Sequence, residues 1–160
     1  MSLDVEPATV LSEDECWYLL ATRTLGRLAT VVAGQPEIFP VNFVVQRPTV
    51  LFRTAEGRKL LSAVMDDRVA FEADDHDFAA GWSVVVKGRA EAMTDSADLE
   101  RAERAQLLSW IPNVKSHYVR IVAAEITGRR FQFGAEPGRR SNDEGAEMPM
   151  NTNVLNAGTP

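Results

Sequence analysis

A short basic segment carries the side chains best suited to hold an anion. Residues 53–59 read Arg-Thr-Ala-Glu-Gly-Arg-Lys, so a hydroxyl, a flexible glycine and three cations fall within seven positions. The segment lies where an expected strand ends and an expected helix begins, and free helix-N-terminal amides together with positive charge suit a phosphate dianion. A run of this kind is more often a solvated helix start. On spacing alone, both interpretations stand.

The other reactive side chains form no recognisable catalytic or metal site. His76 is surrounded by aspartates, but His117 is distant in the sequence and no cysteine or second histidine stands at ligand spacing. The single cysteine, Cys16, falls in an apolar helical pattern, where we expect a buried structural thiol. The sequence contains no nucleophile elbow, no Rossmann fingerprint and no P-loop. We therefore expect no metal, and a hydrolase is disfavoured.

Composition narrows the class of protein further. The chain has 160 residues with a hydrophobic share of 45%, which is typical of one globular domain. Its net charge of -6 repels polyanions, so we expect no nucleic-acid partner. The N-terminal residues show no signal-peptide pattern and no run is long enough to span a membrane, which predicts a cytoplasmic protein without a membrane partner.

The first half of the chain reads as one helix, a hairpin and a third strand. Ser12 and Glu15 have the spacing of a capping box, which predicts a short helix after them. Residues 27–33 and 37–45 are β-branched and apolar on either side of a predicted turn at Gly34-Gln35. A turn at Arg47-Pro48 then leads into a strand over residues 50–54.

The second half alternates helices and strands. The patterns predict a helix over residues 58–66, a strand through 69–73, an acidic loop over 74–77 and a strong strand over 81–90, in which Gly88 indicates a bulge or a close backbone approach. Asp95 is the expected N-cap of a helix through Ser109. Two last strands, 118–126 and 130–133, are expected to join at Thr127-Gly128.

Together these elements predict a mainly β protein with flanking helices. Six or seven antiparallel strands in meander favour a barrel. We expect an N-terminal extension over residues 1–11, one domain over residues 12–133, and a disordered tail over residues 134–160, where no apolar period is sustained.

Three segments resemble a known family. These are Glu-Ile-Phe-Pro-Val-Asn at 37–42, Phe-Arg-Thr at 52–54 running into Arg58-Lys59, and Trp-Ser-Val-Val-Val-Lys-Gly-Arg-Ala-Glu at 82–91. They resemble the FMN-binding core of pyridoxamine-phosphate-oxidase-like proteins, and the third segment is similar to that of the small actinobacterial members. The resemblance covers roughly residues 12–133 and implies an FMN-binding split β-barrel of six to seven antiparallel strands.

The resemblance also implies where a flavin would bind. In that family the strand matching 37–42 runs along the flavin ring, a threonine and an Arg-Lys pair bind the flavin phosphate, and a polar residue on the third segment faces the flavin. The chain departs from the true oxidase in a spacing one residue shorter before Arg58, in a serine in place of glutamine, and in an arginine in place of tyrosine. The candidate cofactor-binding residues are Pro40, Val41, Asn42, Arg53, Thr54, Arg58, Lys59, Trp82 and Ser83.

Two tryptophans are further candidates for stacking on a flat cofactor. The indoles of Trp82 and Trp110 could each lie against a flavin ring, and core packing is the alternative for both. Residues 40–42 also have an alternative to contacting the flavin ring. They could be ordinary strand residues, with Pro40 at an edge or a bulge.

The resemblance implies a homodimer with cofactor sites at its interface and an oxidoreductase dependent on FMN or a deazaflavin. The substrate-binding C-terminal segment of the true oxidase is missing, so that particular activity is not expected. Two alternatives remain: a non-enzymatic protein that binds flavin, haem or another flat ligand, and a dimeric structural protein whose site has decayed.

Overall fold

The computed structural model describes residues 8–54, 68–104 and 117–134. The expected helix over 58–66, the residues Arg58, Lys59 and Trp110, and the C-terminal tail from residue 135 lie outside this part of the chain. The described elements are β1 (Ala8–Val10), α1 (Glu13–Ala21), β2 (Leu25–Val32), β3 (Gln35–Gln46), β4 (Thr49–Thr54), β5 (Arg68–His76), β6 (Ala80–Ala92), α3 (Ser96–Arg104) and β7 (His117–Gln132).

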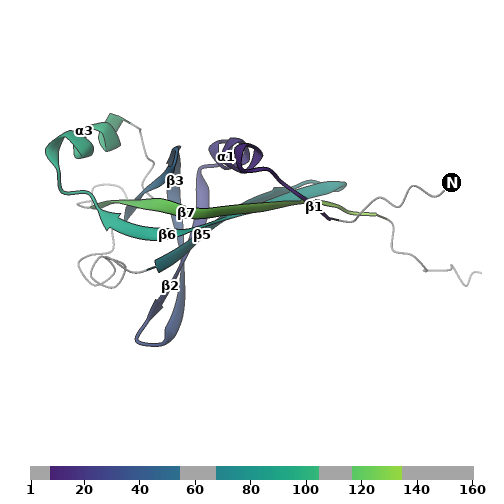
Figure 1. Ribbon diagram of the computed structural model, residues 1–160, viewed down its shortest axis with the longest axis horizontal. Coiled ribbons are helices and arrows are strands. Elements are labelled where there is room, and N and C mark those ends of the chain that lie inside the picture. The colour runs from purple at the N-terminus through teal and green to yellow at the C-terminus, as the bar shows by residue number, and fades with distance from the viewer. Residues whose placement is uncertain (1–7, 55–67, 105–116, 135–160) are drawn as a thin grey trace, which may run out of the picture.

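The strands form one antiparallel sheet that closes into a ring. Within the described residues the strand order is β1-β7-β4-β3-β2-β5-β6, and β6 pairs again with β7. This confirms the expected mainly β fold with an antiparallel split barrel. The order is not a simple meander, because β5 returns to pair with β2 instead of β4. Figure 1 shows α1 on one side of the long strands β6 and β7, with the β2–β3 hairpin projecting on the other side.

Helix α1 begins as the sequence predicted. The amide of Ser12 donates to Glu15 Oε2 at 2.8 Å, and the amide of Glu15 donates to Ser12 Oγ at 3.2 Å, which completes the capping box. Cys16, Trp17 and Leu20 form the buried side of the helix. The expected buried thiol is confirmed, and burial raises the pKa of Cys16 above its ordinary value.

The last two predicted strands are one continuous strand, so the predicted joint at Thr127-Gly128 is wrong. Strand β7 pairs with β6 on both sides of Gly128, which lies opposite Val84. A Cβ on Gly128 would lie 2.7 Å from the Cys16 sulfur and 3.0 Å from a methyl carbon of Leu11. Glycine is therefore needed here because α1 packs closely on the strand, and it makes no turn.

Two shorter predictions also need correction. The β2–β3 turn lies at Ala33 and Gly34, one residue earlier than expected, and both have positive φ, 49° and 76°. Asp74 to His76 were expected in a loop but extend β5, because they pair with β6 and because Arg23 bridges to Asp75 at 2.7 Å.

Gly88 was predicted to mark a bulge or a close backbone approach, and the structure confirms both. Lys87 pairs with Glu125 while Gly88 pairs with Ala123, so Ala124 is an extra residue in β7 and the ladder shifts at this point. A Cβ on Gly88 would lie 2.0 Å from the carbonyl oxygen of Val122. Only glycine allows the two backbones to approach this closely.

The barrel interior holds the main hydrophobic core. Phe43 and Phe71 meet edge to face there, with ring centroids 4.7 Å apart, and Phe52 is buried in the same cluster.

Helix α3 covers a second, smaller cluster around Leu51 and Ala102. As predicted, Asp95 caps this helix by accepting from the amides of residues 97 and 98. None of the described helices is long and apolar enough to cross a membrane.

Candidate functional site

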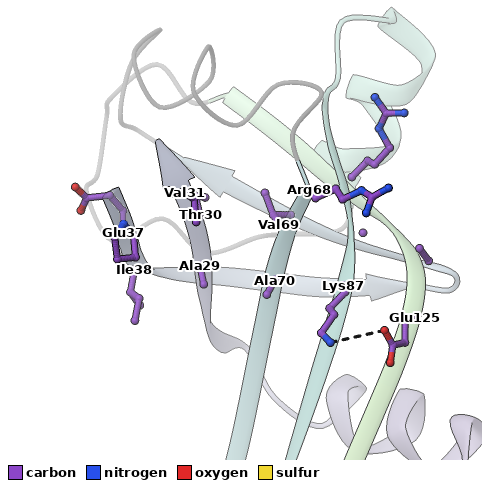
Figure 2. A pocket seen from close by; sticks show the side chains of 14 residues that line it. Ala29, Thr30, Val31, Glu37, Ile38, Arg68, Val69, Ala70, Lys87 and Glu125 are labelled. Carbon is purple, nitrogen blue, oxygen red and sulfur yellow. Dashed lines mark ion pairs between the residues drawn. The ribbon is translucent and has the colours of Figure 1, made fainter. Parts of the chain in front are cut away.

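A ligand-sized concavity lies on the outside of the barrel. Burial alternates along β2 and β5, so every second residue faces away from the core. At one end of this outer face five strands surround a pocket of about 680 Å³ (Figure 2). Its lining residues are Ala29, Thr30, Val31, Pro36, Glu37, Ile38, Arg68, Val69, Ala70, Lys87, Gly88, Arg89, Ala124 and Glu125.

The pocket wall is mainly apolar, and its charges are unevenly distributed. Arg68 and Arg89 lie directly opposite each other on β5 and β6, and Lys87 follows on the same strand as Arg89. Lys87 pairs with Glu125 at 3.7 Å. Glu37 belongs to β3, on the far side of β2 from these cations, as Figure 2 shows. The lining therefore suits a mainly apolar ligand with an anionic group at one end.

Thr30 borders the pocket and is the buried polar residue of β2. The Thr30 side chain is 5% exposed, and its hydroxyl has no hydrogen-bond partner within the described part of the chain. Thr30 belongs to the buried row of β2 together with Gly26 and Leu28, whereas Ala29 and Val31 face outward, so its hydroxyl lies on the inner side of the strand.

Beside the pocket lies an ionic cluster that the sequence analysis missed. Arg27 donates to Glu72 at 2.9 Å and approaches Asp74 at 3.5 Å. Burial is the largest influence on Glu72 and raises the pKa of its carboxyl despite the arginine. The period-2 pattern of residues 25–32 and 68–76 indicates that all three side chains face outward. Nothing local in the sequence shows that they meet, because β2 and β5 are far apart in the chain.

Three of the predicted site residues share this outer face but do not line the pocket. Pro40 lies opposite Arg27 in the β2–β3 register, and Asn42 follows two residues further along the same side of β3. Ser83 lies opposite Asp74 on β6. The Arg27 cluster therefore separates Pro40 on β3 from Ser83 on β6.

Two other candidates face the core. Val41 is 5% exposed, lies opposite Gly26 and belongs to the barrel core. Trp82 is half-buried, packs against the same core and lines a small pocket of about 170 Å³ together with His76 and Arg130. The indole of Trp82 therefore contributes to packing, and its stacking on a cofactor stays a prediction.

The phosphate-binding candidates are described only in part. Arg53 lies on the side of β4 that α3 covers, with its guanidinium carbon 6.0 Å from the centre of the Tyr118 ring. Its Nε is buried and has no hydrogen-bond partner among the described residues. For Thr54 the structure gives the backbone, which pairs with His117 in β7. Arg58 and Lys59 lie outside the described residues.

The described residues offer no metal site. Across residues 8–54, 68–104 and 117–134, no three histidine, cysteine or carboxylate side chains come together to hold a metal ion. This face combines a mainly apolar pocket that carries Arg68, Lys87 and Arg89 with an adjoining cluster of one arginine and two carboxylates.

A closed antiparallel ring with helices at its sides and a ligand-sized pocket on its outer face defines a split β-barrel protein. The family model described as pyridoxamine 5'-phosphate oxidase matches residues 12–130. The chain therefore belongs to the pyridoxamine 5'-phosphate oxidase family, as the resemblance of the three segments implied.

Several relatives resemble the chain over most of their own length. An uncharacterised protein of Mycobacterium tuberculosis is 60% identical over 96 residues, which are 60% of this chain and 87% of the relative. The solved FAD binding protein from Mycobacterium smegmatis is 54% identical with a TM-score of 0.69. The match covers 78% of this chain and 99% of the Mycobacterium smegmatis chain. A solved FAD-binding protein from Mesorhizobium loti is 26% identical with a TM-score of 0.65. The match covers 77% of this chain and 97% of the Mesorhizobium loti chain.

Proposed function

We propose that this protein binds a flavin on the outer face of its barrel and uses it in an oxidoreductase reaction. The observation that carries the proposal is the pocket of about 680 Å³, whose walls include residues from two of the three segments that resemble the flavin-binding core. Glu37 and Ile38 come from the first segment, and residues 87–89 from the third. When bound, the flavin supplies the redox chemistry, while the protein binds and orients it.

The choice of flavin is the finer part of the proposal. The resemblance implies FMN, with a deazaflavin as the alternative. Two relatives, at 54% and 26% identity, are named as FAD-binding proteins, and they favour adding FAD to the candidates. All three cofactors combine a flat tricyclic ring with phosphate, which agrees with the apolar and cationic lining.

We retain the sequence-derived site as part of this proposal. Thr54, Arg58 and Lys59 would bind the phosphate nearest the ring, and the face that carries Pro40, Asn42 and Ser83 would lie beside the flavin. The Arg27 cluster lies between these last three residues, so it would present a guanidinium and two carboxylates to the polar edge of the ring.

A second copy of the chain is the partner we propose for the exposed part of this face. Val31 and Ile38 are 61% and 68% exposed and adjoin the pocket on the β2–β3 hairpin. Apolar side chains gathered at a pocket mark an interaction surface. A twofold homodimer would cover both hairpins and create two equivalent cofactor sites.

The cellular setting that we propose is the cytoplasm. A net charge of -6 disfavours a nucleic-acid partner. The single cysteine is buried and makes no disulfide, which agrees with a reducing compartment.

The competing function is a carrier that holds a flavin without turnover, and two measurements separate the possibilities. Titration with FAD, FMN and a deazaflavin, followed by tryptophan fluorescence, should give saturable quenching. Reduction of the bound flavin, followed by mixing with candidate acceptors, should then give reoxidation faster than in buffer. Quenching without accelerated reoxidation would favour the carrier, and no quenching by any of the three would contradict flavin binding.

A further inference from the structure

Toward one end of the barrel, the row of side chains that faces the core changes from apolar to polar. A buried row across β5, β6 and β7 consists of Ala73, Val84 and Gly128. Side chains two positions further along each strand face the same way. That next row consists of Asp75, Trp82 and Arg130. A carboxylate, an indole and a guanidinium therefore follow directly on the buried row.

This polar row borders a small pocket of about 170 Å³, which we call the Trp82 pocket. Its lining residues are Asp75, His76, Asp77, Ala80, Gly81, Trp82 and Arg130, and none of them lines the outer-face pocket. Trp82 packs against the core, and because consecutive strand residues point to opposite faces, it faces away from Ser83. A cavity of about 150 Å³ is enough for a benzene ring, so the Trp82 pocket has room for one small ring.

Both carboxylates of the Trp82 pocket already have partners in the protein. Asp75 Oδ1 accepts from the amide of His76 at 2.9 Å, and Asp75 Oδ2 pairs with Arg23 at 2.7 Å. Asp77 Oδ1 accepts from two amides of the following turn at 2.8 and 2.7 Å, and these hydrogen bonds lower the pKa of Asp77. The two aspartates therefore hold the pocket in shape.

The guanidinium of Arg130 is the group of this pocket that is left for a ligand. Within the described residues, the side chain of Arg130 forms no ion pair and donates no hydrogen bond. Glu15 is near enough for Arg130 to lower the pKa of its carboxyl, but hydrogen bonds to Ser12 have the larger influence and hold that carboxylate at the start of α1. A guanidinium binds a carboxylate through two parallel hydrogen bonds. An anion in the pocket would therefore meet an available cation.

We infer that the Trp82 pocket binds a small aromatic carboxylate, with its ring against the indole of Trp82 and its carboxylate on the guanidinium of Arg130. Trp82 and Arg130 lie directly opposite each other on β6 and β7, so the cation stands beside the flat apolar surface. The volume limits the ligand to about one ring. This site is separate from the proposed flavin site and does not depend on it.

The test measures the binding of benzoate to the full chain by calorimetry, with benzylamine as a cationic ring of similar size. We expect the wild type to bind benzoate saturably and not to bind benzylamine. Arg130→Ala should weaken benzoate binding at least about tenfold, because a charge-assisted contact is lost. Arg129→Ala is the matched control. Arg129 is the neighbouring exposed arginine, it lies opposite Ser83 and faces away from the pocket, so this variant should bind benzoate as the wild type does.

A second variant reports where the ring lies. Benzoate should change the tryptophan fluorescence of the wild type, and Trp82→Phe should still bind benzoate in calorimetry but lose that change. A fluorescence change that persists in Trp82→Phe would overturn the inference, because the ligand would then lie beside another tryptophan.

Three further results would also overturn the inference. They are a wild type that does not bind benzoate or binds benzylamine equally well, an Arg130→Ala variant with unchanged affinity, and competition between benzoate and FAD. The last result would place benzoate in the proposed flavin site. None of these results bears on whether the protein binds a flavin on its outer face.

Discussion

The backbone of Gly128 lies against the sulfur of Cys16, so closely that a Cβ at position 128 would be 2.7 Å from it. This contact joins the middle of the longest strand, β7, to the buried side of α1. The helix therefore packs directly on the barrel wall, and the strand runs through the contact without a turn.

Gly128→Ala should destabilise the protein by about 1 to 3 kcal/mol, because the added methyl overfills a packed contact. Denaturant unfolding followed by circular dichroism measures the loss. Gly134→Ala is the matched control, since a Cβ there meets no atom within 4 Å and should change stability little. Equal stability of the two variants would show that α1 moves away without cost.

Ile38→Glu should weaken the proposed homodimer at least about tenfold, because a charge would be buried at the hairpin interface. Sedimentation at several protein concentrations reports the association. Val10→Glu is the control, since Val10 is 77% exposed on β1 and is not part of the hairpin. A wild type that stays monomeric at all concentrations, or an Ile38→Glu variant that remains dimeric, would contradict the interface.

Lys59→Ala should lower the affinity for FMN and for FAD alike, by about 1 to 3 kcal/mol, because one charge-assisted contact to the shared phosphate is lost. Fluorescence titration gives both dissociation constants, and Lys59→Arg should retain most of the affinity. Unchanged affinity in Lys59→Ala would remove that residue from the site.

Glu15→Gln should change how stability depends on pH. Hydrogen bonds to Ser12, from its backbone first and its side chain second, lower the pKa of Glu15 below its ordinary value of 4.5. The unfolded chain therefore binds more protons in this range, so the contribution of Glu15 is present above pH 4.5 and is lost as pH falls through the folded-state pKa. The wild type should lose stability on acidification more steeply than Glu15→Gln, measured by unfolding at a series of pH values. Glu13→Gln keeps the capping box and should follow the wild type, so parallel curves for all three would contradict the assignment.

Local sequence signals predicted the elements well where a residue pattern is typical of only one kind of local structure. The capping box at Ser12 and Glu15, the N-cap at Asp95 and the bulge at Gly88 are all present. Gly128 was misread because glycine marks both turns and close backbone contacts, and only the packing of α1 distinguishes them. Asp74 and Asp75 resembled a loop because the arginines that hold them, Arg27 and Arg23, come from a distant part of the chain.

The candidate site was less predictable than the fold for the same reason. Two of the three segments in the resemblance border the outer-face pocket, but the residues in its lining depend on register and alternation across five strands. Arg68 and Arg89 meet through pairing between β5 and β6, and no spacing along the chain indicates it. Val41 and Trp82 face the core in this chain, which alternation alone did not decide.

The most direct test of flavin binding is an absorbance spectrum, in the near ultraviolet and visible, of the full-length protein after incubation with FAD and removal of free ligand by gel filtration. The account predicts a yellow protein that retains flavin in proportion to its chains, with the flavin bands shifted from those of free FAD. A colourless protein that also fails to retain FMN or a deazaflavin would contradict it.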